Sequence, residues 1–331
     1  MAEFLTFDTD LTAVANAIRA KGGTSAQLIY PSGFVSAIQA IQTGITPKLV
    51  VTTSAGAAVT AVKGSKTVSG TADTDGTCTL EIPEAGEWSV TAAKDGLSRT
   101  QTFVIGTQSM TLLPVDPVFS NSSWAEIIAA CHAGFVPDTW AVGDSKPMAI
   151  NGTNYQIDII GKNHDVYADG SGTAPLTFQL HDCYADTNPM NSSNTNSGGW
   201  ASCAMRSTHL PAILALMPTE VQNGIREVNK LTSGGGHSDT INTTADKLFL
   251  LSEIEIFGSV SYSKSGEGTQ YDYYKAGNSR AKNRNGSADY WGERSPYGGN
   301  SETCCTVYTN GNASYDAGAN FATGVAFGFC F

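Results

Sequence analysis

Residues 46–115 alternate apolar and polar side chains with a period of two, and this alternation constrains the fold more than any other feature of the chain. Turn residues interrupt the pattern roughly every 8–12 positions, which is typical of a small β-sandwich. We expect Gly76 and Gly86 to turn the chain and Trp88 to fill the core. The segment shows no pattern of a binding site, and we interpret it as a spacer.

Residues 1–45 carry a helical pattern instead. Asp8 or Asp10 is placed to cap a helix. The apolar residues of this helix recur at the spacing of one helical face: Leu11, Val14, Ala15 and Ile18. A second, shorter stripe follows the KGGTS break: Phe34, Ile38 and Ile41. Two such short helices bury their apolar faces poorly by themselves, so we expect this module to pack on another chain or on the next domain.

Residues 116–331 mix helical and strand patterns. The expected elements are helices over 122–134 and 207–230, strands over 148–161 and 175–182, and a central apolar run over 246–258. Ser122 or Ser123 is placed to cap the first helix, and Pro218 interrupts the second. The three segments together predict a multidomain α+β chain: a small helical N-terminal module at 1–45, a β-sandwich at 46–115 and an α+β domain at 116–331.

Charge and hydropathy argue against several classes of protein. The formal net charge is −11 and the sequence pI is about 4.8, and Lys and Arg are scattered along the chain. A nucleic-acid binder needs a basic face, so we expect no nucleic-acid partner. No window approaches about 18 consecutive apolar residues, so we expect no membrane insertion. The acidic N-terminus lacks a basic region followed by an apolar one, so we expect no secretory signal.

The cysteines predict buried thiols. There are seven, an odd number, and none forms a CxxC pair. This pattern favours neither a disulfide framework nor a zinc site, and we expect no cofactor. A bridge between the adjacent Cys304 and Cys305 would be strained. Cys305 alternates with Val307 and is expected to be buried, whereas Cys304 is expected on the displayed side.

The C-terminal stretch has the composition of binding loops. Between Tyr297 and Thr323 there is no Leu, Ile, Met, Lys or Arg, and Asn, Tyr, Ser, Asp and Gly recur instead. Tyrosine offers a large, rigid contact area, while Ser, Gly and Asn add adaptable hydrogen bonds, as in antibody loops. The alternative is a set of turns, which favour Asn, Gly and Ser for backbone reasons alone. Turn chemistry does not require tyrosine, so we favour a binding surface.

Two N-terminal segments resemble modules of phage proteins. DLTAVANAIRAKGGTSAQLIYPSGFVSAIQAI, residues 10–41, resembles a short segment of many tail and baseplate proteins of phages that infect Gram-positive bacteria. DTDGTCTLEIPEAGEWSVTA, residues 73–92, resembles the Ig-like or carboxypeptidase-regulatory-like modules that serve as spacers in phage and cell-surface proteins. The resemblances imply tail attachment through residues 1–45 and an Ig-like spacer at 46–115.

Residues 116–331 resemble a domain of unknown function that is widespread in Gram-positive bacteria and their phages. The motifs that carry the resemblance are IDIIGKNHD, SGTAPLTFQLHDC, MNSSNTNSGGWASCAMR, DKLFLLSEIEIFG, GEGTQYDYYK, ERSP and GVAFGF. The resemblance implies a C-type-lectin-type fold, with two helices flanking a small twisted sheet and long loops that carry binding. The same fold occurs in variable proteins of diversity-generating retroelements, which mutate adenine-rich codons in a C-terminal repeat.

In such variable proteins, small or apolar residues hold the backbone between displayed positions. The scaffold that this resemblance implies is Val307, Gly311, Ala313, Ala317, Ala319, Gly324, Val325, Phe327 and Phe329. The displayed ligand-binding set, in a variable-type region at about 290–323, is Tyr290, Gly292, Tyr297, Asn300, Glu302, Tyr308, Asn310, Asn312, Tyr315, Asp316 and Asn320. Glu302 fits less well, because adenine changes alone do not convert an Asn codon to Glu.

Other groups of residues favour structural roles. His164, Asp165 and Asp169 are close in sequence but lack the spacing of a calcium loop, so we expect no metal. Near Trp200, we expect packing of the indole and an internal ion pair of Arg206 with Glu253 or Glu255; no nucleophile has a recognisable base. The aromatic residues of 271–291 are equally consistent with stacking on sugars or with the core: Tyr271, Tyr273, Tyr274, Tyr290 and Trp291.

These observations and resemblances predict a non-enzymatic receptor-binding protein of a phage tail. It would be made in the host cytoplasm and carried on the virion, and it would bind a bacterial surface protein or glycan. Residues 1–45 would contact other tail proteins, and the unburied stripe there favours a homo-oligomer, with a trimer as the first expectation. The alternatives are a bacterial cell-surface adhesion protein and an enzyme of the formylglycine-generating type, whose cysteine-pair motif does not match here.

Overall fold

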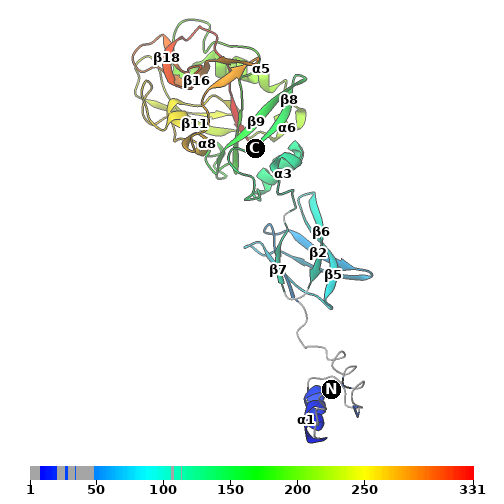
Figure 1. Ribbon diagram of the computed structural model, residues 1–331. Coiled ribbons are helices and arrows are strands. Elements are labelled where there is room, and N and C mark those ends of the chain that lie inside the picture. The colour runs from blue at the N-terminus through cyan, green and yellow to red at the C-terminus, as the bar shows by residue number, and fades with distance from the viewer. Residues whose placement is uncertain (1–7, 21–26, 29–33, 35–47, 106–107, 113) are drawn as a thin grey trace, which may run out of the picture. The chain divides into compact units, whose positions relative to one another are not determined.

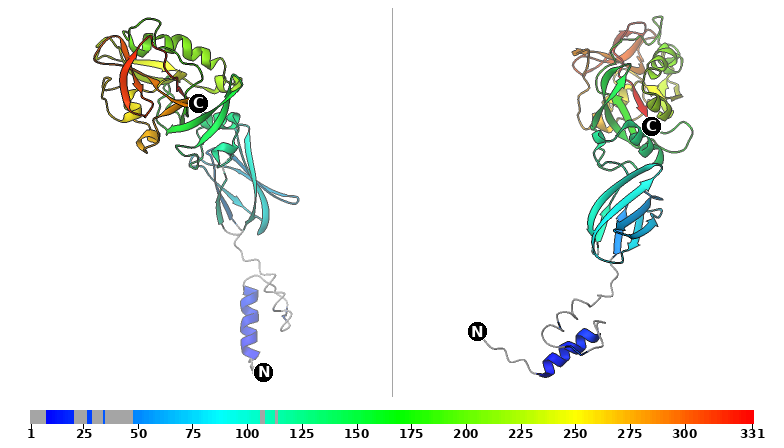
Figure 2. Two further views of the ribbon diagram at one scale, coloured as in Figure 1. Left: turned by 45° about the horizontal axis from the view of Figure 1, so that its top comes forward. Right: turned by 90° about the vertical axis from the view of Figure 1, so that its right-hand side faces the viewer.

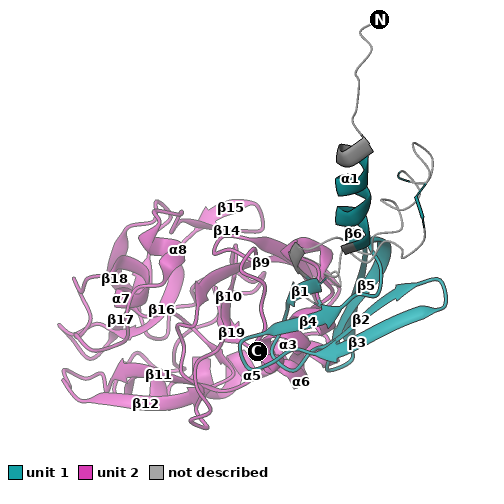
Figure 3. Cartoon of the chain, turned by 90° about the horizontal axis from the view of Figure 1, so that it is seen from below, with its two compact units in different colours: residues 1–114 teal, residues 115–331 magenta. Residues whose placement is uncertain are grey.

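The computed structural model of the protein describes residues 8–20, 27–28, 34, 48–105, 108–112 and 114–331 (Figure 1). The chain divides into two compact units, residues 1–114 and 115–331 (Figure 3). The predicted boundary after residue 115 lies one residue from this division. Several separate sheets and short helices make up the two units. The protein is therefore a multidomain α+β chain, as the sequence predicts.

The N-terminal helix α1 spans Asp8–Ala20. A small apolar cluster comprises Leu11, Ala15, Ile18, Leu28 and Phe34. Val14 was predicted on the same face but is 48% exposed. The prediction fails at Val14 because so small a cluster covers only a narrow stripe of the helix. Ile38 and Ile41 lie outside the described residues.

Residues 48–112 form a two-sheet β-sandwich (Figure 2). Its strands are β1 Lys48–Thr52, β2 Ala58–Lys63, β3 Lys66–Thr71, β4 Thr77–Glu81, β5 Gly86–Lys94, β6 Leu97–Ile105 and β7 Gln108–Thr111. One sheet has the order β4-β1-β7, in which β1 and β7 are parallel, and the other has the antiparallel order β3-β2-β5-β6. Buried residues alternate with exposed ones along β1 and β4, as expected for strands with one face on a core.

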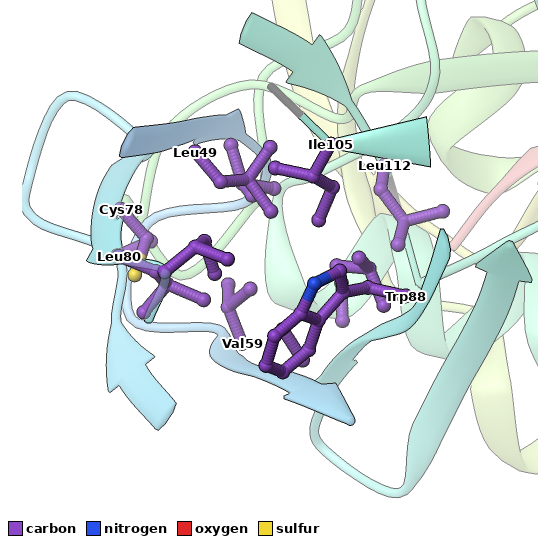
Figure 4. Packing of buried hydrophobic residues seen from close by; sticks show 13 residues of the cluster. Leu49, Val59, Cys78, Leu80, Trp88, Ile105 and Leu112 are labelled. Carbon is purple, nitrogen blue, oxygen red and sulfur yellow. The ribbon is translucent and has the colours of Figure 1, made fainter. Parts of the chain in front are cut away.

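Trp88 occupies the core of the sandwich (Figure 4). Its side chain is 1% exposed, and its indole N–H donates to the carbonyl of Glu84 at 3.1 Å. Gly76 has a φ of +76° in the turn before β4, and a Cβ there would lie 2.3 Å from the carbonyl oxygen of Thr53. Gly86 has a φ of +126° where β5 begins. Both conformations favour glycine, so the predicted roles of these three residues are confirmed.

We predict that Trp88→Ala lowers the free energy of unfolding of the sandwich by about 3–5 kcal/mol, because it leaves a large cavity in the core. Scanning calorimetry of the whole chain measures the shift of the sandwich transition. Val104→Ala is the matched control, since Val104 lies in the same sandwich and is 70% exposed. A shift no larger than that of the control would show that Trp88 does not support the core.

Residues 115–331 combine short helices with several sheets. The helical elements are η1 Phe119–Asn121, α3 Trp124–Ala133, α4 Gly199–Ser202, the π-helical turn η2 Met205–His209, α5 Leu210–Leu214, α6 Thr219–Gly224, α7 Glu253–Phe257 and α8 Asp272–Lys275. The strands are β8 Ser145–Ile150, β9 Thr153–Lys162, β10 Leu176–Leu180, β11 Val228–Ser233, β12 Ile241–Asp246, β13 Leu248–Phe249, β14 Lys282–Arg284, β15 Ser287–Asp289, β16 Trp291–Pro296, β17 Thr303–Val307, β18 Ala313–Gly318 and β19 Gly328–Cys330.

The largest sheet of this unit has the order β13-β19-β10-β9-β8. The last strand of the chain therefore lies inside the sheet, between β10 and β13. Phe178 of β10 stacks on Phe329 of β19 with ring centroids 5.3 Å apart, and Trp124 of α3 packs edge-on against Phe178. Ser123 caps α3 in a capping box with Glu126, as one of the two predicted caps. A second sheet, β16-β17-β18, carries the C-terminal stretch.

The predicted helix over 207–230 is only partly helical. The π-helical turn η2 and the short helices α5 and α6 occupy its first part, and α6 ends at Gly224. Residues from Val228 onward form β11, which pairs with β12. The end of the prediction was wrong because Pro218 already breaks the helical hydrogen bonding, and the strand pairing of Val228–Ser233 outweighs a weak local helical preference.

Candidate ligand-binding face

Arg294 lies in β16, which pairs with β17 of the C-terminal stretch, and is fully buried. Its guanidinium makes two hydrogen bonds to the Glu255 carboxylate of α7 and donates to the carbonyl of Glu267 at 2.8 Å. Lys230 of β11 lies 2.8 Å from the same Glu255 carboxylate and 2.7 Å from Asp165. Side chains from segments far apart in the sequence thus form one buried charge network. No local sequence pattern predicted these pairings.

The charges in this network compensate one another. Burial alone would raise the pKa of the Asp165 carboxyl, but the charges and hydrogen bonds of Lys230 and His164 together outweigh it and the pKa is lowered. Burial likewise opposes ionisation of Glu255, yet Arg294 and then Lys230 hold its pKa below the ordinary value. The two carboxylates of the network therefore stay ionised at neutral pH. Removal of one partner leaves a buried charge unpaired, which costs about 3–5 kcal/mol.

Glu293, the neighbour of Arg294 in β16, is buried without such compensation. Neither of its carboxyl oxygens has a hydrogen-bond partner among the described residues. Burial raises the pKa of this carboxyl well above its usual value, and the nearby Glu253 and Glu267 carboxylates raise it further. Folding therefore favours the protonated form of Glu293. An unpaired buried acid of this kind destabilises the folded state.

We predict that Glu293→Leu raises the free energy of unfolding by about 1–3 kcal/mol at neutral pH, because it removes an unsatisfied polar group. Below the pKa that Glu293 has in the unfolded chain, its carboxyl is protonated in both the folded and the unfolded state. As pH rises above that value, folding of the native chain must bind a proton, and its stability falls. The gain from Glu293→Leu should thus be larger at pH 7 than at pH 4.

Urea unfolding at the two pH values measures this gain. Glu293→Gln is the matched variant, since it removes the titration but keeps a polar group without partners. Glu293→Gln should abolish the pH-dependent part of the stability difference. It should keep most of the loss of stability that a buried polar group without a partner causes. Equal stability of the native chain and Glu293→Leu at both pH values would contradict the burial and protonation of Glu293.

Two other buried polar side chains hold the loops next to the C-terminal stretch. The Asn196 side-chain amide donates to the carbonyl oxygens of Thr303 at 2.7 Å and Asn300 at 3.0 Å. The Glu253 carboxylate accepts hydrogen bonds from the backbone N–H groups of residues 261–263 at 2.7–3.1 Å. Asn196 and Glu253 therefore fix the loops that lead into β17 and that follow α7. Neither residue was predicted to have this role.

The C-terminal stretch separates buried from exposed side chains. The buried scaffold residues are Val307, Gly311, Ala319, Gly324, Val325, Phe327 and Phe329, with Ala313 and Ala317 half-buried. Among the predicted ligand-binding residues, the exposed ones are Glu302, Tyr308, Asn310, Asn312, Tyr315, Asp316 and Asn320. Tyr290, Tyr297 and Asn300 are half-buried. We call the surface formed by these ten residues the display face; that it binds a ligand stays a prediction.

Two residues predicted on this surface are buried. Gly292 lies in β16, and a Cβ there would come within 2.8 Å of Thr323 Oγ1. All residues of β16 are buried, so a period of two does not separate inner from outer positions there. Cys304 of β17 is also buried, and burial raises the pKa of its thiol to about 12. The predictions for Gly292 and Cys304 were wrong, whereas the predicted burial of Cys305 is confirmed.

Three aromatic rings and one carboxylate line a pocket on the display face. Tyr290 stacks on Tyr308 with centroids 6.2 Å apart and on Phe321 with centroids 5.9 Å apart. Asp316, Ala317 and Gly318 of β18 complete the lining of a cavity of about 240 Å³. We call this cavity the Tyr290 pocket. Phe321 was not predicted to take part, although it is the one phenylalanine between Tyr297 and Thr323.

A second aromatic group comprises Tyr262, Tyr297 and Tyr315, which we call the Tyr262 cluster. Tyr315 stacks on Tyr297 with ring centroids 4.4 Å apart, and its ring is tilted against that of Tyr262 with centroids 4.6 Å apart. Tyr262 belongs to the loop that Glu253 holds. The cluster therefore joins the C-terminal stretch to a loop outside the predicted set. No sequence pattern connects Tyr262 with the display face.

Some asparagines of the display face also stabilise turns. The Asn300 side-chain oxygen accepts hydrogen bonds from the backbone N–H groups of Glu302 and Thr303, both at 2.9 Å. Asn310 accepts one from the backbone of Asn312 at 3.1 Å. The turn interpretation therefore applies to Asn300 and Asn310. It does not account for the exposed tyrosines.

The other candidate residues have structural roles. Asp165 belongs to the buried charge network, and Asp169 pairs with Arg226 at 2.6 Å. Across the described part of the chain, no three His, Cys, Asp or Glu residues gather as a metal site. Of the aromatic residues at 271–291, four are in the core and only the half-buried Tyr290 reaches the pocket; the buried ones are Tyr271, Tyr273, Tyr274 and Trp291.

The predicted ion pair of Arg206 with Glu253 or Glu255 is not formed. Arg206 forms an ion pair with Asp246, at the end of β12. Trp200 is fully buried, as predicted, and its indole N–H donates to the same Asp246 carboxylate at 2.8 Å. The prediction failed because Glu255 is held by Arg294 and Lys230, and Glu253 by backbone N–H groups.

Comparisons with known proteins give limited matches. A family model described as a domain of unknown function (DUF6273) matches residues 176–330, from β10 to β19. No curated protein matches the chain. Among the solved structures to which the chain shows similarity is one described as a Ca²⁺-stabilized adhesin that helps an Antarctic bacterium reach out and bind ice. It is 14% identical, covers 42% of this chain and 45% of the adhesin chain, and has a TM-score of 0.14, so no conclusion rests on it.

Helix length bears on membrane insertion. Within the described ranges, no helix is both long enough and apolar enough to cross a bilayer.

Proposed function

We propose that this protein is a receptor-binding protein of a phage tail that recognises a bacterial surface ligand through the display face. The main support for the proposal is the exposure of tyrosine, asparagine and aspartate side chains on β18 and its adjoining loops, next to strands β16 and β17, which are almost wholly buried. The C-type-lectin-type fold and the likeness to retroelement variable proteins belong to the same proposal. Residues 1–45 would attach the protein to other tail proteins as part of a trimer, and the sandwich would act as a spacer.

The display face has the properties of a binding surface. Tyr308, Tyr315 and Phe321 are each at least 40% exposed, although large aromatic side chains usually avoid water. Buried hydrogen bonds fix the backbone that carries these aromatic residues. They include the bond of Arg294 to Glu255 and that of Asn196 to the carbonyl of Thr303. A rigid backbone lowers the entropy that a ligand must overcome to bind. Exposed aromatic side chains on such a backbone are typical contact residues of recognition surfaces.

Binding rather than catalysis is proposed because the adjacent thiols lack the chemistry of nucleophiles. Cys304 and Cys305 are buried, and burial raises the pKa of both thiols, to about 12 for Cys304. A reactive cysteine needs an accessible thiolate near neutral pH. These thiols therefore give no support to the formylglycine-generating alternative. A bacterial adhesion protein would use the same face, and detection of the protein on purified virions rather than on the cells that make it separates the two.

The test is binding of the whole protein to intact cells from a panel of Gram-positive bacteria. In the display variant, Tyr308→Ser, Asn312→Ala and Tyr315→Ser are combined. In the matched control, the exposed apolar residues Val166 and Leu216, which lie in the same unit outside the display face, are changed to Ala. We expect the native protein and the control to bind the same strains, and the display variant to bind at least about ten-fold more weakly because it loses aromatic anchors.

Circular dichroism and thermal unfolding establish that all three proteins are folded. Binding of the display variant at the native level would show that the display face is not the receptor-binding surface. Failure of the native protein to bind any strain would remove the support for receptor binding and favour a structural role.

A further inference from the structure

The Tyr290 pocket has an unusual charge environment. The stretch from Tyr297 to Thr323 contains no Lys or Arg, and its only formal charges are those of Glu302 and Asp316. Among the described residues, those that line the pocket include a carboxylate, Asp316, and no cation. One Asp316 oxygen accepts a hydrogen bond from the Ser314 hydroxyl at 2.6 Å. The pocket therefore combines aromatic walls with a carboxylate that has no ion-pair partner within the described chain.

The electrostatics of Tyr290 agree with this description. The pKa of its phenol is raised, first by burial and then by the negative charges of Asp289 and Asp316. Asp289 already pairs with Arg284, whereas Asp316 faces the cavity. The part of this shift that comes from the two carboxylates favours a positive charge at the same place, whereas burial disfavours any charge.

The Tyr262 cluster provides a contrast on the same face. Its loop carries Lys264, whose side chain lies against Gly298 and forms an ion pair with Asp239 at 2.7 Å. A cation is thus already present beside that cluster. The difference between the two aromatic groups points to the Tyr290 pocket as the place where a positively charged ligand group would be favoured.

We propose that the Tyr290 pocket binds a substituted ammonium group of the surface ligand, with the aromatic rings contacting the cation and Asp316 compensating its charge. This inference rests on the proposed function and names the ligand chemistry of one part of the display face. Aromatic faces attract ammonium ions, most strongly when water is excluded. The cavity, with the volume of roughly eight water molecules, accommodates a trimethylammonium group. Two sources share this chemistry: a choline-type group and a primary amine on a cell-surface polymer.

Calorimetric titration of the whole protein tests the inference with three probes. These are choline, ethanolamine and the uncharged carbon isostere of choline, in which a tert-butyl group replaces the trimethylammonium group. We expect one of the two ammonium compounds to bind at least about ten-fold more tightly than the isostere, because the isostere fills the cavity without the charge. Preference for choline would identify an alkylated source, and preference for ethanolamine would identify a primary amine.

Two variants connect the binding to this pocket. Asp316→Asn keeps the shape of the side chain and should weaken ammonium binding about ten-fold, while Tyr290→Leu should abolish most of it. Asp138→Asn is the matched control, because it removes the same charge from an exposed position that does not line the pocket. It should leave the affinity unchanged. An equal loss in Asp316→Asn and Asp138→Asn would contradict a specific role of Asp316.

Other results would overturn the inference. Equal binding of choline and its isostere would show an apolar pocket, and binding of a neutral hexose in place of either ammonium would show a sugar-stacking site. Absence of ammonium binding in a protein that still binds cells through the display face would overturn this inference alone. Ammonium binding by a protein that binds no cells would instead contradict the proposed function and leave the pocket chemistry intact.

Discussion

The ion pair between Arg294 and Glu255 is the interaction on which the C-terminal unit depends most. Both side chains are buried, and Lys230 extends the pair to Asp165. These residues come from β16, α7, β11 and the segment after β9, so the network connects the sheet of the display face with the rest of the unit. A buried pair of this kind is costly to break, because the remaining partner stays charged in a region without water.

In the C-terminal stretch, some side chains support the backbone and others are exposed to solvent. The backbone of β16–β18 is held from below by Arg294, by Asn196 and by the buried apolar residues. Display-face residues such as Tyr308 and Asn312 are exposed and contribute little to the core. Exposed positions tolerate substitution within about 0.5 kcal/mol. The same backbone can thus carry different exposed residues, as the proposed receptor-binding surface would require.

The sequence predicted the parts of the structure that follow from local patterns. The period of two identified the sandwich with its buried Trp88, and the fixed small and apolar residues of the C-terminal stretch are buried or half-buried as expected. Gly292 and Cys304 were misplaced because both faces of their strands are covered. The charge network was missed because Arg294 lies 39 residues from Glu255, and Lys230 lies 65 from Asp165. Pairings at such separations depend on the tertiary fold, which periodicity does not reveal.

We infer that the side chains of the display face contribute little to the stability of the backbone that supports them. Urea unfolding of two variants measures both contributions: one variant has Tyr308, Asn312, Asp316 and Asn320 all changed to Ala, and the other has Arg294→Lys. We expect a loss of less than about 2 kcal/mol for the fourfold variant and a larger loss for Arg294→Lys, because an ammonium cannot make the two hydrogen bonds of the guanidinium to Glu255. A larger loss in the fourfold variant than in Arg294→Lys would contradict this inference.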